Sequence, residues 1–374
     1  MNILLNLILS VTFLFSGGCK SESENNKNGF KNSEKTAAQT EVFVQDLEVP
    51  WSIVFISNER ILVNERPGRM RVITGGILQD EPIKTFSEVS SGSEEGLMGL
   101  TLDPEYASNK LIYVSFAYEK EGDLWVKVVR YKDNGSSLTE ETTIFDNIPA
   151  ARFHAGCRIK FGPDNKLYIT TGDAGERKFA QDLDKLQGKI LRINPDGTIP
   201  ADNPFANSPV WSYGHRNPQG IDWVPGTDIM WQTEHGPSGF DGPGGGDEVN
   251  VIVKGGNYGW PEVSHTDSKE GMVSPILVFT PAEAPASGLV YKSGKLAEFK
   301  DTFLFGCLRG NGIMVVKIDP NDRTKALSFT KIATEYGRIR DITEGPDGFI
   351  YFSSSNKDGR GSPKSGDDKI YRIR

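Results

Sequence analysis

Three histidine-containing segments in the middle of the chain carry the residues best suited to chemistry. They are FHAGCR around His154, YGHRNPQG around His215 and EHGP around His235, and they hold three of the four histidines. Glycine and proline between these segments favour tight turns, and loops on a rigid scaffold are where catalytic groups usually lie. We therefore expect the functional site in residues 153–261, with the rest of the chain as its frame.

His154 and Asp173 form the first candidate pair. They bracket the unit FGPDNKLYITTG, which is typical of two antiparallel strands joined by a turn, so the two residues can meet at one end of a sheet. A carboxylate beside an imidazole fixes the tautomer and raises basicity, as a general base requires. The alternative is a structural histidine that is bonded to a loop carbonyl.

Two further segments offer donors and ligands. Arg216 and Asn217 are adjacent donors in a turn closed by proline and glycine, and fixed donors suit an oxygen that gains negative charge. The segment that begins at Glu234 and includes Asp247 and Glu248 combines carboxylates with glycine and proline turns, a donor set that Ca²⁺ prefers. The alternatives are a loop held by buried hydrogen bonds for the first segment and a solvated loop for the second.

A pair of arginines lies near the end of the chain, in the segment RIRD. Strand alternation puts Arg338 and Arg340 on one face, where two guanidinium groups favour an anionic partner such as a ligand carboxylate. Arg309, after the apolar run TFLFGCL, is a candidate to join them. The alternative is a set of salt bridges to neighbouring acidic residues.

The elements that must position these residues are short strands in a repeated pattern. Apolar runs alternate with turn signals, and Asp103, Asp164 and Asp228 mark turns about 60 residues apart with no helical period between them. Six such units fit the chain, each long enough for one four-stranded blade. The sequence predicts an all-β fold, a six-bladed β-propeller with four-stranded blades. A two-domain β-sandwich protein is the alternative.

The N-terminus predicts export. Residues 1–18 hold a short apolar run and small residues before Cys19, which together resemble a lipoprotein-type signal peptide, although Ser16 and the missing positive charges depart from that pattern. Residues 19–41 are polar and are expected to form a flexible tether, so the propeller should cover 42–374. We expect a lipid-anchored periplasmic or cell-envelope protein, attached to the membrane only through Cys19, with simple secretion as the alternative.

Composition narrows the partners. A formal net charge of −8 argues against nucleic-acid binding. In an exported protein Cys157 and Cys307 can pair or remain two buried thiols, and the sequence leaves both possibilities open. No C-x-x-C-H haem motif is present, so a redox enzyme would need an external electron acceptor, a quinone or a cytochrome.

Taken together and in order, the motifs resemble the soluble quinoprotein glucose/sorbosone dehydrogenase family, close to its aldose sugar dehydrogenases. The matching segments include VPWSIVF, NERPGR, GLMGLTLDPEY, HAGCR, GDAG, WSYGHRNPQG, EHGP, GDEVN, GGNYGWP and RIRD. The resemblance covers nearly everything after the tether. It implies a six-bladed propeller that binds pyrroloquinoline quinone (PQQ) and Ca²⁺ and oxidises an aldose at C1 to its lactone.

The resemblance also implies roles for single residues. His154 would be the general base, Asp173 its orienting carboxylate and Arg216 the group beside the reactive quinone carbonyl. The implied cofactor-binding residues are Glu94, Arg216, Asn217, Arg309, Arg338 and Arg340. Carbonyls of Gly236 and Pro237 would hold the Ca²⁺ at the cofactor, and Glu248 and the Tyr258 carbonyl a second, structural Ca²⁺.

Three departures bear on the substrate. Glu94 stands where relatives usually carry Gln, Cys157 replaces a common Gly, and the loop 238–246 is longer than expected. The protein should act as a monomer or dimer. Two rival functions remain open: a sugar-binding propeller without redox turnover, and a Ca²⁺-dependent sugar lactonase, in which RIRD would have no role.

Overall fold

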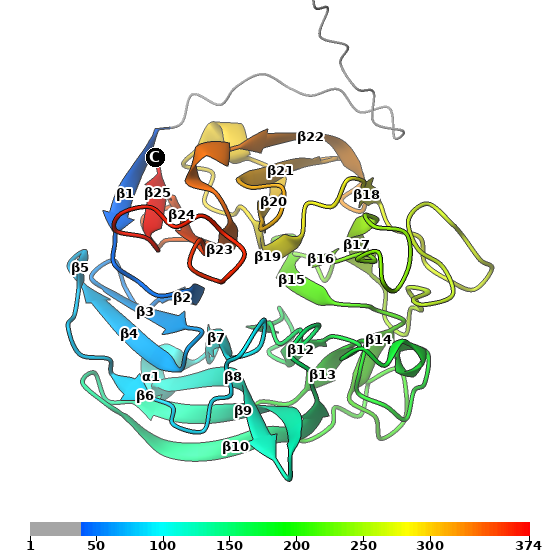
Figure 1. Ribbon diagram of the computed structural model, residues 1–374, viewed down its shortest axis with the longest axis horizontal. Helices are drawn as coiled ribbons and strands as arrows, with labels where there is room; N and C mark the ends of the chain where they lie inside the picture. The colour runs from blue at the N-terminus through cyan, green and yellow to red at the C-terminus, as the bar shows by residue number, and fades with distance from the viewer. Residues whose placement is uncertain (1–38) are drawn as a thin grey trace, which may run out of the picture.

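Six antiparallel sheets stand around a central axis in the computed structural model, which describes residues 39–374 (Figure 1). The fold is a six-bladed β-propeller with almost no helix, as the turn spacing predicted. The helical turns are α1 (Tyr106–Asn109), η1 (Arg177–Ala180), η2 (Ala297–Phe299) and η3 (Thr334–Tyr336). None of the helices in this part of the chain is long and apolar enough to cross a membrane.

The first three blades follow one another along the chain, and in each the first strand lies nearest the axis. The first blade holds β2 (Pro50–Phe55), β3 (Arg60–Glu65), β4 (Arg69–Thr74) and β5 (Ile77–Leu78), with the short β6 (Lys84–Thr85) also on β4. The second holds β7 (Leu97–Leu102), β8 (Leu111–Lys120), β9 (Asp123–Asp133) and β10 (Leu138–Pro149). The third holds β11 (Ile159–Phe161), β12 (Leu167–Thr171), β13 (Lys189–Ile193) and β14 (Val210–Tyr213).

The remaining blades complete the ring. The fourth holds β15 (Pro218–Trp223), β16 (Met230–Glu234), β17 (Asp247–Ile252) and β18 (Leu277–Phe279). The fifth holds β19 (Pro285–Val290), β20 (Thr302–Cys307), β21 (Ile313–Ile318) and β22 (Ala326–Ile332). The sixth holds β23 (Ile339–Glu344), β24 (Ile350–Ser354), β25 (Ile370–Ile373) and β1 (Thr40–Val44).

The ring closes through β1, the first strand of the described chain. This strand pairs antiparallel with β25, so the sixth blade contains both ends of the folded part (Figure 1). The pairing covers the edge that β25 would otherwise expose. It also corrects the expected boundary, because Thr40 and Glu41 belong to β1 and not to the tether. The expected signal peptide and the tether up to residue 38 lie outside the described residues.

Apolar side chains fill the spaces between adjacent blades. One buried cluster joins Trp51, Tyr113 and Ile159 from the first three blades, and another joins Val249 and Phe303 from the fourth and fifth. Each sheet is therefore covered on both faces, which explains strands such as β15 and β20 in which every residue is buried. With the sheets fixed in this way, the loops that precede the inner strands are held rigidly around the axis.

Candidate functional site

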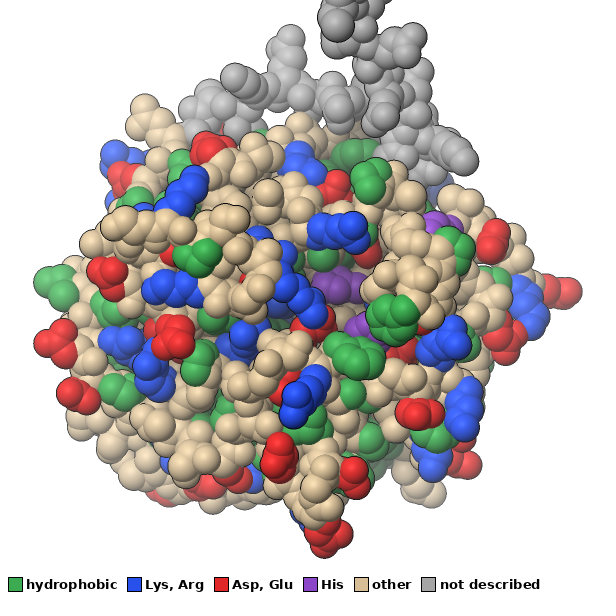
Figure 2. All heavy atoms as spheres, in the orientation of Figure 1, with side chains coloured by type: hydrophobic (Ala, Val, Ile, Leu, Met, Phe, Trp, Pro, Cys, Tyr) green, Lys and Arg blue, Asp and Glu red, His purple; other side chains and the backbone are tan. Residues whose placement is uncertain are grey.

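A cavity of about 380 Å³ lies at the end of the central axis, where loops from all six blades meet. Figure 2 shows this hollow near the middle of the face, with histidine, lysine or arginine and acidic side chains around it. Ten of the residues singled out from the sequence line it: Glu94, His154, Arg216, His235, Gly236, Pro237, Asp247, Arg309, Arg338 and Arg340. Asp173, Asn217, Glu248 and Tyr258 do not line it.

His154 and Asp173 meet at the ends of the β11–β12 hairpin. Nδ1 of His154 lies 2.7 Å from Oδ1 of Asp173, and both side chains are almost fully buried. Asp173 is itself held by the Trp260 indole N–H at 2.8 Å and by the Gly175 N–H at 2.8 Å. Since Nδ1 is engaged with the carboxylate, Nε2 is the ring nitrogen left to act as acceptor, and no hydrogen bond to it occurs among residues 39–374.

The backbone around His154 is tightly packed. A Cβ on Gly172 would lie 1.8 Å from the carbonyl oxygen of His154, so only glycine allows this approach. The His154 N–H donates to Oε2 of Glu94 at 3.1 Å. The histidine is thus fixed from three sides, by Gly172, Glu94 and Asp173.

Arg216 is held by the loop 238–246, the segment that is longer than the resemblance leads us to expect. Its Nε donates to Oδ2 of Asp241 at 2.8 Å, and Nη2 donates to Oγ of Ser238 at 2.8 Å. Nη1 of Arg216 also lies 3.3 Å from the carbonyl oxygen of His235, which precedes the loop. Asp241 was not predicted from the sequence. The signal that could have found it was a single acidic residue within a glycine-rich loop beside the site.

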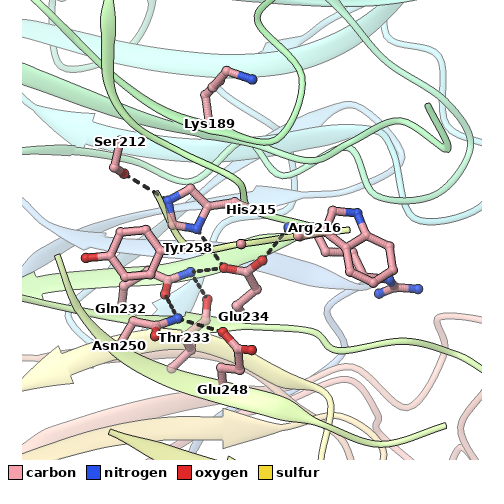
Figure 3. A network of polar contacts seen from close by, with 12 residues as sticks. Lys189, Ser212, His215, Arg216, Gln232, Thr233, Glu234, Glu248, Asn250 and Tyr258 are labelled. Atoms are coloured by element: carbon pink, nitrogen blue, oxygen red, sulfur yellow. Dashed lines mark hydrogen bonds and ion pairs between the residues drawn. The ribbon is translucent and has the colours of Figure 1, made fainter. Parts of the chain in front are cut away.

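A buried network of polar side chains contacts the backbone of Arg216 (Figure 3). Nδ1 of His215 lies 2.8 Å from Oε2 of Glu234, and Oε1 of Glu234 accepts the Arg216 N–H. Nε2 of His215 bonds Oγ of Ser212 at 2.8 Å, and the ring stacks on Tyr258 at 4.6 Å. Both ring nitrogens of His215 therefore have partners, and the residue holds the loop in place. This is the structural alternative that the sequence left open for this segment.

Asn217 is buried and does not line the cavity. Its Oδ1 accepts a hydrogen bond from Nε2 of Gln219 at 2.9 Å, while its buried Nδ2 has no partner among the described residues. Contact between Asn217 and a cofactor, which the resemblance implied, stays a prediction. Gln219 lines the cavity.

The two arginines of RIRD differ in their surroundings. Arg338 is paired with Asp358, with Nη2 and Nε at 2.6 and 2.8 Å from Oδ2. Within residues 39–374 Arg340 has no carboxylate in contact and its buried Nε has no partner, while Nη1 donates to Oε1 of Gln219 at 3.2 Å. Burial lowers the pKa of Arg340 to about 9. An unpaired buried cation that lines a cavity is a site for an anionic group.

Glu94 and Arg360 form an ion pair at the rim. Oε1 of Glu94 lies 2.7 Å from Nη1 of Arg360. Burial alone would raise the pKa of Glu94, but positive charge on His235 and the hydrogen bond from Arg360 lower it to about 2. Burial lowers the pKa of His235 to about 4, so His235 is neutral at pH 7. The charged partner of Glu94 at that pH is Arg360. Neither His235 nor Arg360 was assigned a role from the sequence.

The expected metal ligands fall in two separate places. Gly236 and Pro237 line the main cavity, and the Pro237 carbonyl also accepts the Gly245 N–H at 3.2 Å. Glu248 and Tyr258 line a second, much smaller cavity of about 10 Å³. Within residues 39–374 no group of three or more His, Cys, Asp or Glu side chains could hold a metal ion. Any Ca²⁺ here would depend mainly on carbonyl oxygens and on its ligand.

The second place carries unbalanced charge. Glu248 pairs across the strands with Glu234, and Oδ1 of Asn250 beside it is buried without a partner in the described chain. Burial and the neighbouring Glu234 raise the pKa of Glu248 well above its usual value. A small cation would relieve both features, so the donor set fits Ca²⁺.

Cys157 and Cys307 are both free thiols, which resolves the question that the sequence left open. They are fully buried in different clusters, one formed by the first three blades and the other by the fourth and fifth. Burial raises the pKa of both thiols. They behave as small apolar residues.

Comparison with known proteins decides the family. The sequence model of the Glucose / Sorbosone dehydrogenase family matches residues 47–370. The chain belongs to this family. It is 32% identical to an aldose sugar dehydrogenase of Escherichia coli (strain K12), over 85% of this chain and 90% of that protein. It is 27% identical to quinoprotein glucose dehydrogenase B of Acinetobacter calcoaceticus, over 83% of this chain and 84% of the relative.

A solved structure agrees with this assignment. The PQQ-bound aldose sugar dehydrogenase of Streptomyces coelicolor superimposes with a TM-score of 0.79 at 30% identity, covering 91% of this chain and 99% of that one. These relatives are named as dehydrogenases, so the chain falls among oxidoreductases. The resemblance found in the sequence is confirmed at the level of family and fold.

Proposed function

We propose that this protein oxidises aldose sugars at C1 to lactones, with PQQ as cofactor, Ca²⁺ as its metal and His154 as general base. One observation carries the proposal: His154 is bonded through Nδ1 to Asp173 at 2.7 Å and lines the same cavity as the unpaired Arg340. A base and an anion site in one cavity suit an enzyme that binds an acidic cofactor beside a sugar.

The cavity fits PQQ on chemical grounds. PQQ carries carboxylates, and Arg340 offers a buried Nε without a partner, with Arg338 and Arg309 beside it. When bound, PQQ supplies the acceptor for the hydride from the sugar, chemistry that no side chain can supply. Main-chain oxygens of Gly236 and Pro237 suit Ca²⁺ at the same place, and Glu248 with the Tyr258 carbonyl suits a second ion.

The residues of the chain then have distinct tasks. Nε2 of His154 accepts the proton from the C1 hydroxyl of the sugar. Asp173 holds the imidazole in the required tautomer and stabilises its positive charge. Arg216, fixed by Asp241 and Ser238, presents a positive charge to an oxygen that gains negative charge during the reaction. Glu94 orients His154 through its backbone.

The rival functions are less well supported. A metal-dependent lactonase would need acidic and amide ligands around a metal on the axis, and the described residues contain no such cluster of acids. A sugar-binding propeller would need neither the histidine–carboxylate pair nor an unpaired buried arginine. We also propose that the protein is exported and carries a lipid anchor at Cys19. An external quinone or cytochrome would accept the electrons, and the protein would act as a monomer or dimer.

Dye reduction tests the proposal directly. Protein lacking residues 1–38 should reduce an artificial dye in the presence of an aldose only when PQQ and Ca²⁺ are both added. Chelation of Ca²⁺ should abolish the signal, and re-addition should restore it. Tight binding of PQQ without aldose-dependent reduction would reject sugar oxidation, and absence of PQQ binding would reject the cofactor assignment.

A further inference from the structure

Two aromatic side chains stand exposed beside the cavity, and neither takes part in the chemistry described above. Phe153 is 37% exposed and Phe240 is 72% exposed, and their ring centroids lie 6.1 Å apart at nearly right angles. Phe153 also touches the ring of His154 edge-on at 4.9 Å. Figure 2 shows hydrophobic side chains next to the histidines at the hollow. Exposed large apolar groups gathered at a cavity indicate a binding surface.

The Phe153 ring and the backbone next to Phe240 are held in place by residues of the site. Phe153 packs against Gly175, the residue whose N–H supports Asp173. Phe240 directly precedes Asp241, which is fixed by Arg216 and by the Ser238 N–H at 2.8 Å. The Asp241 carbonyl also accepts a hydrogen bond from Nη1 of Arg177 at 2.9 Å. A pre-positioned aromatic surface loses little conformational entropy when it binds a ligand.

Resting on the function proposed above, we propose that Phe153 and Phe240 form a subsite for the second sugar ring of a reducing disaccharide or longer oligosaccharide. The reacting ring must place its C1 at Nε2 of His154, inside the cavity. A ring linked to it would extend toward the mouth, where the apolar C–H face of a pyranose can pack on an aromatic ring. The loop 238–246, which carries Phe240, therefore sets the preference for chain length, while the oxidation takes place in the cavity.

The test compares two sugars on one variant. Wild type and Phe240→Ala, each loaded with PQQ and Ca²⁺, are assayed with glucose and with maltose. The ratio of kcat/KM for maltose to that for glucose should fall about fivefold in the variant, mainly through the KM for maltose, because one aromatic contact is lost. Phe240→Tyr should restore the ratio. Ile77→Ala removes a similarly exposed side chain, 69% exposed, from an outer strand and should leave the ratio unchanged.

A second readout does not depend on turnover. Saturation-transfer NMR with maltotriose should show transfer to a second ring in wild type and its loss in Phe240→Ala. If glucose is oxidised but the ratio and the NMR transfer are the same in both proteins, the subsite is wrong and the proposed function stands. If no aldose is oxidised but the transfer depends on Phe240, the oxidation is wrong and the subsite stands. A change only in the KM for the dye would assign the rings to the electron acceptor and overturn the subsite.

Discussion

Two histidine–carboxylate pairs occupy corresponding places in the third and fourth blades. In each pair the partners are 19 residues apart, the histidine precedes the inner strand, and the carboxylate lies at or just beyond the end of the next strand. The contact distances are 2.7 Å for His154–Asp173 and 2.8 Å for His215–Glu234. Spacing and pairing alone do not distinguish them.

The difference lies in the second ring nitrogen. Nε2 of His215 is occupied by Ser212, and its ring is covered by Tyr258. His154 lines the cavity instead, beside Glu94 and Arg216. A histidine bonded to a carboxylate can therefore serve as a base or as a structural contact, and the environment of its other ring nitrogen decides which.

The largest effect should come from His154→Gln. Without a base at Nε2, kcat should fall by about a thousandfold, within the usual contribution of general base catalysis. Binding of PQQ, measured by its absorbance on the protein, should remain. A kcat close to that of wild type would remove His154 from the mechanism and with it the contrast between the two pairs.

Asp173→Asn should have the next largest effect. The amide can keep the contacts with Trp260 and Gly175 in part, but it carries no charge to stabilise the protonated imidazole. We expect kcat to fall about a hundredfold with little change in KM, which steady-state kinetics can measure. The matched change in the other pair, Glu234→Gln, should lower kcat less than tenfold. Equal losses in both variants would contradict the distinction.

Arg340→Met tests the anion site that accompanies the catalytic pair. Affinity for PQQ, measured by titration of the cofactor-free protein, should fall about tenfold to a hundredfold because a charged hydrogen-bonding partner is lost. The cofactor-free variant should be as stable as wild type or more stable, because an unpaired buried charge is replaced by an apolar chain of similar length. Arg338→Met, which leaves Asp358 without its partner, should be destabilised instead.

The lowered pKa of Arg340 predicts that the affinity for PQQ depends on pH. Burial lowers the pKa of Arg340 to about 9 in the cofactor-free protein, so the charge that attracts an anion is present below pH 9 and is lost above it. The affinity of wild type for PQQ should therefore fall as pH rises through 9, by about tenfold per pH unit well above it. Arg340→Met should show no such slope, and an identical slope in both proteins would assign the titration to another group.

The sequence allowed some of this site to be predicted because the relevant geometry is local. The His154–Asp173 contact follows from one hairpin, and the blades follow from regularly spaced turns. Asp241, Asp358 and Arg360 were missed because they lie on loops whose conformation depends on contacts with distant blades, such as Arg360 with Glu94. For Asn217 the motif was clear, but the direction of a side chain in a turn is not set by spacing, so its contact with a cofactor stays a prediction.

The smallest catalytic effect, and the clearest contrast, should come from His215→Gln. This change removes the contact with Glu234 and the stacking on Tyr258, and it leaves buried polar groups partly unsatisfied. The free energy of unfolding should fall by about 1–3 kcal/mol, measured as a lower midpoint in denaturant. Since Arg216 remains held by Asp241 and Ser238, kcat should fall less than tenfold. A variant as stable as wild type but without turnover would make His215 a catalytic group and would show that the two pairs act together.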